Sequence, residues 1–382
     1  MEVAFRHSTS SDVVRNRNVR CRILYIVGQL GAGGSERQLY VLLKSMDRDV
    51  YLPHVVVWNF NPDDTYLSKI RKIGVPLHFF PSSLTAAGKM LAFRRMVLEL
   101  SPEVIHSYSF YTNVAAWWAA LGRKIIAVGA VRSSFTNDRR SCGLLLGNLC
   151  ARWPSNQIFN NLAAAQRARK SLSPFAPRRI FVVRNRVDLQ QFPKTPLSSN
   201  GQARILAVGS LAPYKRWDRL LRAAATLKEA GYDFLVEIVG DGPLRRSLER
   251  QVQDLALMDR VKFVGYTNDV SPCLSSSTFL AHTSDLEGCP NTVMEAMASG
   301  RPVVAMDAGD IPILVEDGKT GFVVRRGDET QFVERLVTLI SHRELCRQMG
   351  EASRVKAERE FALDRLVEET TAAYRAAGWK NL

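Results

Sequence analysis

Short, continuously apolar and β-branched runs alternate with helix-like segments along almost all of the 382 residues. Apolar runs without polar alternation are typical of strands buried on both faces, and helices between them indicate parallel sheets covered by helices. The pattern therefore predicts an α/β protein with doubly wound parallel sheets. The predicted strands lie at 22–28, 54–58, 75–80, 103–107, 125–131, 179–183, 204–209, 234–240, 261–264, 278–281, 302–305 and 321–324.

The strand pattern restarts after Phe192. We therefore expect two Rossmann-like domains, at 1–192 and 204–361, joined by a linker at 193–203 that is rich in Pro, Ser, Gly and Asn. A last helix in the segment 362–382 can pack on either domain, and we expect it to cross back to the first.

Positive charge is concentrated in the first half of the chain. Residues 1–200 contain 28 Lys and Arg against 11 Asp and Glu, a net charge of +17, whereas the remainder carries 24 against 26, or −2. Such asymmetry indicates an anionic partner: a nucleic acid, an acidic lipid surface or a phosphorylated substrate. A solubility role for the charge stays open. The basic residues are dispersed and match no recognition motif, so we expect no nucleic acid.

Six cysteines lie far apart with no Cys-x-x-Cys pair, which disfavours a disulfide scaffold or a zinc ribbon and fits a reducing compartment. Residues 1–20 contain no apolar core of a secretion signal, and no apolar run approaches the roughly 20 residues of a spanning helix. We expect a cytoplasmic protein.

The first strand ends in a glycine-rich turn that includes Gly31, Gly33 and Gly34 and leads into an amphipathic helix at 37–46. Such a turn lets backbone amides approach a phosphate at the positive end of the helix. A nicotinamide-dinucleotide fingerprint requires a third glycine where Glu36 stands. A dehydrogenase therefore fits the turn less well, and a glycine loop needed only for the chain reversal is an alternative.

Residues 284–300 predict one short helix, with Pro290 as its first residue and Gly300 just past its end. Glu287 then lies in the preceding loop and Glu295 inside the helix. The free amides of residues 289–293 form a potential anion site between these two carboxylates. Carboxylates beside an anion site are consistent with a ligand that also carries hydroxyls, such as a nucleotide sugar; capping and surface roles are the alternative.

Glu287 and Glu295 match an E-x7-E motif, and other blocks match in the same order: 208–215, 240–243, 302–305, 315–324 and the turn at 33–36. Together they resemble glycosyltransferase family four, the retaining transferases of GT-B fold, over residues 20–378. The resemblance implies two Rossmann-like domains that face a central cleft, with the acceptor on the first domain and the nucleotide-sugar donor on the second.

By this resemblance, Lys215 would contact the diphosphate, Glu295 the ribose and Glu287 the donor sugar. Lys215 and Glu287 would be the catalytic residues, and a loop at 265–269 would contact the base. The full donor-binding set implied is Gly34, Ser210, Lys215, Glu287, Gly288, Cys289, Pro290, Asn291, Thr292 and Glu295.

Some positions depart from the family pattern. Ser210 stands where an arginine is usual, so Arg216 or Arg245 would substitute as the second diphosphate cation. Arg186 occupies a turn position normally held by glycine. On the acceptor side, Arg132 replaces the usual histidine, and His106 matches half of a common His-x-His; a purely structural His106 is the alternative.

The implied activity is retaining transfer of a sugar from a UDP-sugar, favoured over a GDP-sugar, to a saccharide or lipid-linked acceptor in polysaccharide or glycoconjugate biosynthesis. A non-transferring GT-B enzyme such as a nucleotide-sugar epimerase is the alternative. We expect no cofactor and no metal, because the single Asp-x-Asp, Asp47 to Asp49, falls at a helix end. Arg94 and Arg95, beside the apolar stretch 90–93, predict docking on the anionic inner face of the cytoplasmic membrane.

Overall fold

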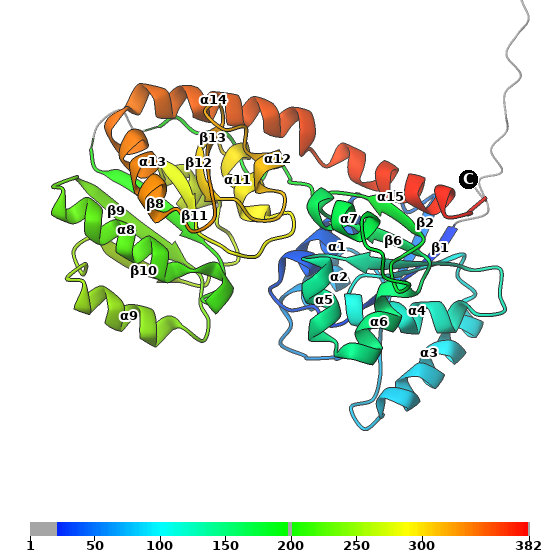
Figure 1. Cartoon of the computed structure of the whole chain (residues 1–382). Coiled ribbons are helices and arrows are strands. Elements are labelled where there is room, and N and C mark those ends of the chain that lie inside the picture. Colours follow the sequence, from blue (N-terminus) through cyan, green and yellow to red (C-terminus); the bar gives the residue numbers. More distant parts are fainter. Residues whose placement is uncertain (1–20, 198–200, 381–382) are drawn as a thin grey trace, which may run out of the picture.

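The computed structural model describes residues 21–197 and 201–380, which form two domains that each contain one parallel sheet (Figure 1). Segment 1–20, in which no secretion signal is predicted, lies outside the described residues. The first sheet has seven strands in the order β3-β2-β1-β4-β5-β6-β7. They are β1 (Cys21–Val27), β2 (Tyr51–Val57), β3 (Leu77–Phe79), β4 (Val104–Ser107), β5 (Ile126–Val131), β6 (Asn156–Phe159) and β7 (Arg179–Val182).

The second sheet has six strands in the order β10-β9-β8-β11-β12-β13, again all parallel. They are β8 (Ala203–Val208), β9 (Phe234–Val239), β10 (Val261–Gly265), β11 (Phe279–His282), β12 (Val303–Met306) and β13 (Gly321–Val324). The two sheets confirm the predicted doubly wound α/β architecture.

Helices cover both faces of each sheet, which explains the continuous apolar character of the strands. In β1, Ile23 and Tyr25 pack into the cluster formed with α1, α2 and α15, whereas Leu24 packs against α3 and α4 on the other face. The first-domain helices are α1 (Gly34–Ser45), α2 (Thr65–Lys72), α3 (Ala86–Leu100), α4 (Asn113–Ala120), α5 (Phe135–Ser141), α6 (Leu144–Arg152) and α7 (Leu162–Arg169).

In β8 the same division occurs: Ile205 faces the cluster with α8, α9 and α13, and Leu206 faces the cluster with α10, α11 and α12. The remaining helices are α8 (Trp217–Glu229), α9 (Arg245–Asp254), α10 (Ser271–Ser276), α11 (Asn291–Ala298), α12 (Ile311–Leu314), α13 (Glu329–Ser341), α14 (Arg343–Glu360) and α15 (Asp364–Ala376).

The chain passes between the domains twice, after β7 and between α14 and α15. The amide of Val187 in the first crossing donates to the carbonyl of Phe361 in the second, at 2.9 Å. After the second crossing, α15 returns to the first domain (Figure 1). There it packs on the first sheet, and Tyr374 contacts Tyr25 and His106. Each domain therefore contains segments from both sides of the predicted linker.

The first crossing is also fastened to the second domain. The buried Arg301 donates to the carbonyl of Thr195 at 2.7 Å and to that of Ser275 at 2.7 Å. Arg186, at the turn where a glycine was expected, pairs with Glu369 of α15 and with the carbonyl of Glu360. The arginine side chain is tolerated at this turn because these partners take the place of water around its guanidinium group.

One strand, β6, was not predicted. It begins with Asn156 and Gln157, so it contains no continuous apolar run. Gln157 is fully buried and its Nε2 donates to the carbonyls of Cys150 and Ala151 at 2.9 Å and Pro154 at 3.3 Å. A buried polar side chain whose amide nitrogen is satisfied in this way stands where a search for apolar strands requires an apolar one.

Three helix starts differ from the prediction. Helix α1 begins at Gly34 rather than at 37, α11 begins at Asn291 with Pro290 as its N-cap, and α15 begins at Asp364 rather than at 362. Gly300, with φ of +72°, follows the end of α11 as predicted. The segment Asp47 to Asp49 lies between α1 and β2, where Asp47 accepts the amide of Asp49 at 2.9 Å.

No helix within residues 21–197 and 201–380 is long and apolar enough to cross a membrane.

Replacing Gln157 by Leu should destabilise the first domain, because three buried carbonyls lose a shared donor. The expected loss is about 1–3 kcal/mol, which corresponds to a melting temperature lower by roughly 3–10 °C. Thermal unfolding followed by circular dichroism measures it. Gln166→Leu on the exposed face of α7 is the control and should change the melting temperature little. Equal melting temperatures for Gln157→Leu and the unsubstituted protein would contradict this role.

Candidate active site

Glu287 and Lys215 meet at the carboxyl end of the second sheet. Lys215 ends the short 3-10 turn η2 (Pro213–Lys215) after β8, and Glu287 lies in the loop between β11 and α11. Glu287 Oε1 lies 2.7 Å from Lys215 Nζ and 2.9 Å from His282 Nε2. Burial alone would raise the pKa of Glu287, but Lys215 and His282 hold that pKa well below its usual range. Glu287 therefore stays ionised near neutral pH.

Glu295 lies on the second turn of α11 and forms an ion pair with Arg37 of the opposite domain. Its side chain is almost completely buried, and Oε2 has no hydrogen-bond partner among the described residues. Burial raises the pKa of Glu295, and the nearby guanidinium of Arg37 only partly offsets this. An unpartnered buried oxygen can accept a hydrogen bond from a ligand hydroxyl.

The first turns of α1 and α11 are joined through Asn291. Its side chain accepts from Gln38 Nε2 at 3.2 Å and from Asn185 Nδ2 at 2.8 Å, and it donates to the carbonyl of Gly34 at 3.3 Å. A Cβ at Gly34 would lie 3.0 Å from Asn291 Nδ2. Gly34 thus permits the close approach of the two domains, and its predicted contact with the donor diphosphate stays a prediction.

A second polar contact closes the domain boundary. The fully buried Asp310 accepts the amides of Leu162 at 3.0 Å and Ala163 at 2.9 Å, so a residue of the second domain caps helix α7 of the first. Burial raises the pKa of Asp310. Nearby, a Cβ on Gly288 would come within 2.7 Å of the carbonyl oxygen of Arg132. Glycine at 288 is required by this approach.

The other predicted donor residues lie around these contacts. Ser210 is exposed, and its hydroxyl lies 3.2 Å from that of Tyr214. Cys289 is buried, which raises its thiol pKa to about 12, and its carbonyl accepts from Asn185 at 2.9 Å. Pro290 is buried and Thr292 half-buried at the start of α11. The donor roles of these residues stay predictions.

The two cations expected to replace the missing arginine are already paired. Arg216 binds Asp218 at 3.0 Å and Asp285 at 2.8 Å, and Arg245 pairs with Glu249. Arg37, from the first domain, is a further cation at the site and pairs with Glu295 on the second turn of α11.

His106 lies inside the first domain rather than on its surface. It is 1% exposed, and its Nδ1 is 2.7 Å from the hydroxyl of Tyr374 on α15. Burial, together with the charge of Arg132, lowers the pKa of His106 well below its usual range, so the ring is neutral. These contacts are those of a structural histidine, and contact of His106 with an acceptor stays a prediction.

Arg132 follows β5 at the domain boundary. Its guanidinium carbon lies 3.7 Å from the ring centroid of Tyr108, and its Nε is buried without a partner among the described residues. Burial raises the pKa of Glu36, and the positive charge of Arg132 acts to lower it. Arg132 is therefore held in place beside the glycine-rich turn; its acceptor role stays a prediction.

Sequence reasoning missed Arg37, His282 and Asp310. Arg37 stands in the first turn of a helix that follows a glycine-rich turn, which is a signal that could have been used. His282 ends a strand five residues before Glu287, and Asp310 acts only through a contact between the domains, which no local pattern shows.

Across the described part of the chain, no three His, Cys, Asp or Glu side chains gather in a group that could hold a metal ion. The site instead combines the amide end of α11 with two carboxylates that are each paired with a cation, Glu287 with Lys215 and Glu295 with Arg37. This set can bind a ligand that carries both negative charge and hydroxyl groups.

Two Rossmann-like domains that meet at the carboxyl ends of their strands define the GT-B architecture. The profile described as Glycosyl transferases group 1 matches residues 190–356, and that described as Glycosyltransferase Family 4 matches residues 32–191. The chain belongs to this family of glycosyltransferases.

Relatives match over part of their length. An uncharacterized glycosyltransferase of Haemophilus influenzae is 35% identical over 178 residues, which is 46% of this chain and 50% of the relative. The N-acetyl-alpha-D-glucosaminyl L-malate synthase of Bacillus anthracis is 28% identical over 187 residues, 49% of each protein. The chain thus spans about half the length of these curated relatives.

Among solved structures, Anabaena HepE in complex with UDP-glucose superposes with a TM-score of 0.80, at 20% identity. The superposition covers 93% of this chain and 99% of that one. At this identity the likeness shows the fold alone.

Proposed function

We propose that the protein is a glycosyltransferase that moves a sugar from a nucleotide-sugar donor to a saccharide or lipid-linked acceptor, with retention of the anomeric configuration. The observation that carries the proposal is the pair of Glu287 with Lys215 in the loop before α11, the helix on which Glu295 pairs with Arg37 of the opposite domain.

The leaving group of such a transfer is a nucleoside diphosphate that gains negative charge as the glycosidic bond breaks. A fixed cation and free helix amides aimed at that charge lower the barrier. Lys215 Nζ is held 2.7 Å from Glu287, which lies four residues before the first residue of α11. We therefore assign leaving-group stabilisation to Lys215 and to the amides of residues 291–293 in the first turn of α11.

The ionised Glu287 supports retention. A carboxylate with a strongly lowered pKa is a weak general base, so it is poorly suited to activate an acceptor hydroxyl for attack from the opposite face. Its charge can instead stabilise the oxocarbenium-like transition state. We infer that the acceptor attacks on the face from which the diphosphate departs, with the diphosphate as proton acceptor.

The orphaned Oε2 of Glu295 supports the ribose assignment. A ribose hydroxyl can donate to this buried oxygen, and Arg37 beside it then contributes charge from the first domain. Donor binding would in this way depend on both domains. We favour a UDP-sugar, the donor type bound by the HepE neighbour. The name of the Bacillus anthracis relative includes L-malate, which is an anion, so an anionic acceptor belongs to the range of candidates.

A screen of UDP-, GDP- and ADP-sugars by thermal shift, followed by transfer assays on saccharide and lipid-linked acceptors, tests the proposal. A donor that is consumed only when an acceptor is present supports transfer. A donor sugar converted to its epimer without any acceptor would instead identify a nucleotide-sugar epimerase.

Lys215→Ala should lower the turnover number by on the order of a hundredfold, because it removes the cation aimed at the departing diphosphate. Lys215→Arg should recover part of the loss. Initial rates at saturating donor measure the effect, with the exposed Lys262→Ala as the control for loss of one positive charge. A Lys215→Ala protein with more than half the original turnover would show that another group holds the diphosphate.

Docking of α3 on a membrane stays a prediction, but two of its residues are engaged within the protein. Phe93 is buried in the core, and Arg94 donates to the carbonyls of Trp118 at 2.7 Å and Leu121 at 3.3 Å. By contrast, Leu144 and Leu145 at the start of α6 are 84% and 76% exposed.

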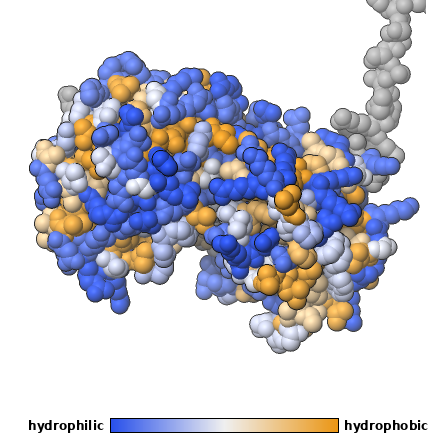
Figure 2. Space-filling view, viewed as in Figure 1, coloured by the Kyte–Doolittle hydropathy of each residue, from blue (hydrophilic) through white to orange (hydrophobic). Residues whose placement is uncertain are grey.

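Figure 2 shows apolar surface over the part of the first domain that α5 and α6 occupy in Figure 1. Arg139 and Arg140 in the last turn of α5 precede these leucines. Charge next to a shallow apolar insertion suits an anionic lipid surface. We therefore propose that the start of α6 docks on anionic membranes.

Leu144→Ser/Leu145→Ser should reduce co-sedimentation with phosphatidylglycerol-containing vesicles by roughly tenfold, since less apolar surface enters the interface. Binding of the unsubstituted protein should also fall as salt is raised. Leu91→Ser/Leu98→Ser on α3, where both leucines are also exposed, is the matched control. If the α3 pair abolishes binding and the α6 pair does not, docking occurs at α3 and this placement is wrong.

A further inference from the structure

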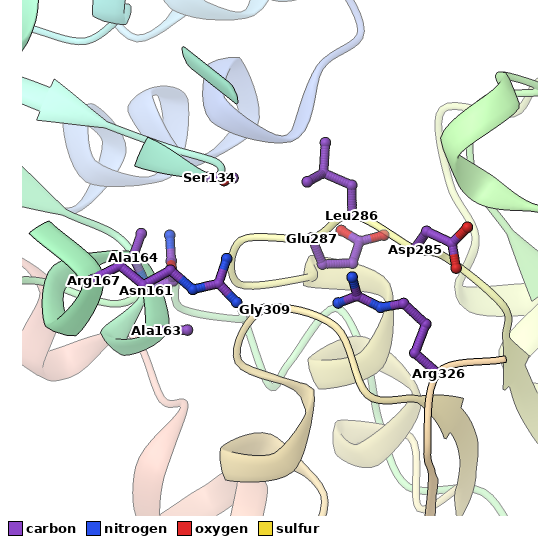
Figure 3. Close-up of a pocket in the computed structure, with 10 residues that line it drawn as sticks. All are labelled: Ser134, Asn161, Ala163, Ala164, Arg167, Asp285, Leu286, Glu287, Gly309 and Arg326. Carbon is purple, nitrogen blue, oxygen red and sulfur yellow. The ribbon is translucent and has the colours of Figure 1, made fainter. Parts of the chain in front are cut away.

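A small pocket that opens to solvent lies between the two domains, next to Glu287 (Figure 3). Ser134, Asn161 and the start of α7 line it from the first domain. The loops that follow β11, β12 and β13 line it from the second, through Glu287, Gly309 and Arg326.

This pocket lies on the opposite side of the Glu287 loop from the proposed diphosphate contacts. Lys215 follows β8, which neighbours β11 on one side, whereas Gly309 and Arg326 follow β12 and β13 on the other. A sugar held at Glu287 would therefore have the diphosphate on one side and this pocket on the other.

Two arginines from opposite domains extend into the pocket. Figure 3 shows the side chains of Arg167, on α7, and Arg326 pointing toward each other below Glu287. Arg326 donates to the carbonyl of Asp307 at 3.1 Å. Among the described residues, no carboxylate forms an ion pair with either arginine.

The two acids that line the pocket are already neutralised by other residues. Glu287 binds Lys215 and His282 at 2.7 and 2.9 Å. Asp285 binds Arg216 at 2.8 Å and the buried Arg219 at 3.2 Å. Neither acid therefore neutralises Arg167 or Arg326. The positive charge of these two guanidinium groups remains uncompensated within the pocket.

Two like charges that face each other across a pocket are stabilised when an anion lies between them, and guanidinium groups bind phosphate and carboxylate with paired hydrogen bonds. We propose that Arg167 and Arg326 bind an anionic group, phosphate or carboxylate, of the acceptor. The inference rests on the proposed transfer function, because that function makes the far side of Glu287 from the diphosphate the place of the acceptor. An acceptor bound by both arginines would also hold the domains together during transfer.

Titration of inorganic phosphate into the full chain by calorimetry, at constant ionic strength and with saturating UDP, tests the site. UDP occupies the diphosphate contacts, so the phosphate signal reports other positions. Arg167→Gln and Arg326→Gln should each weaken phosphate binding about tenfold, and the double variant should abolish it. Lys170 and Arg325 are exposed neighbours of these arginines and do not line the pocket. The control variants Lys170→Gln and Arg325→Gln each remove one positive charge as well and should bind phosphate normally.

Phosphate that does not bind, or that binds all variants equally, overturns the proposal. A UDP titration of every variant separates this outcome from a failure of the proposed function: UDP binding should be unchanged throughout, and its absence in the unsubstituted protein would instead count against the donor site.

The last experiment compares the binding of UDP-glucuronate with that of UDP-glucose. If the unsubstituted protein prefers UDP-glucuronate and both arginine variants lose this preference, the anion belongs to the donor sugar and the acceptor assignment is wrong.

Discussion

The contact between the first turns of α1 and α11 determines how the rest of the site is arranged. Asn291 at the start of α11 bonds to Gln38, to Asn185 and to the carbonyl of Gly34. Because Gln38 and Asn185 are both buried, the contact admits little change in the separation of the two helices. Arg37 then reaches Glu295 across the boundary, and the glycines at 34 and 288 remove the side chains that would block the approach.

Charge is divided between the domains in a way that suits anionic substrates. In the second domain Glu287 pairs with Lys215 and Asp285 with Arg216 and Arg219, whereas Glu295 takes its cation, Arg37, from the first domain. The first domain supplies cations to the boundary without matching carboxylates, as Arg167 illustrates. The concentration of basic residues in the first half of the sequence thus has a counterpart at the site, although most of that charge lies elsewhere on the surface.

Much of the fold follows from local patterns. The buried strands were predictable because their apolar residues are contiguous, and the positions of Glu287 and Glu295 followed from a helix bounded by Pro290 and Gly300. Strand β6 was not predictable in this way, because Gln157 is buried through three hydrogen bonds that depend on the chain around residues 150–154.

The contacts across the domain boundary could not be predicted from local sequence patterns either. Arg37 and Glu295 are separated by 258 positions, and the cap that Asp310 provides to α7 spans 148. For His106, the sequence motif suggested contact with an acceptor, whereas in the fold its ring is buried against Tyr374. Sequence spacing indicates which residues end a strand, but tertiary packing decides which of them face the boundary.

Hydrogen–deuterium exchange of the full chain with and without UDP is the most direct test of the central claim, that a nucleotide binds where α1 and α11 meet. Bound UDP should slow exchange in peptides that cover residues 209–216 and 284–297 of the second domain and 31–38 of the first. Amides at the start of α11 should be the most protected, since they would donate to the diphosphate. Exchange that is unchanged in all three segments at saturating UDP, or protection confined to other parts of the chain, would contradict the account.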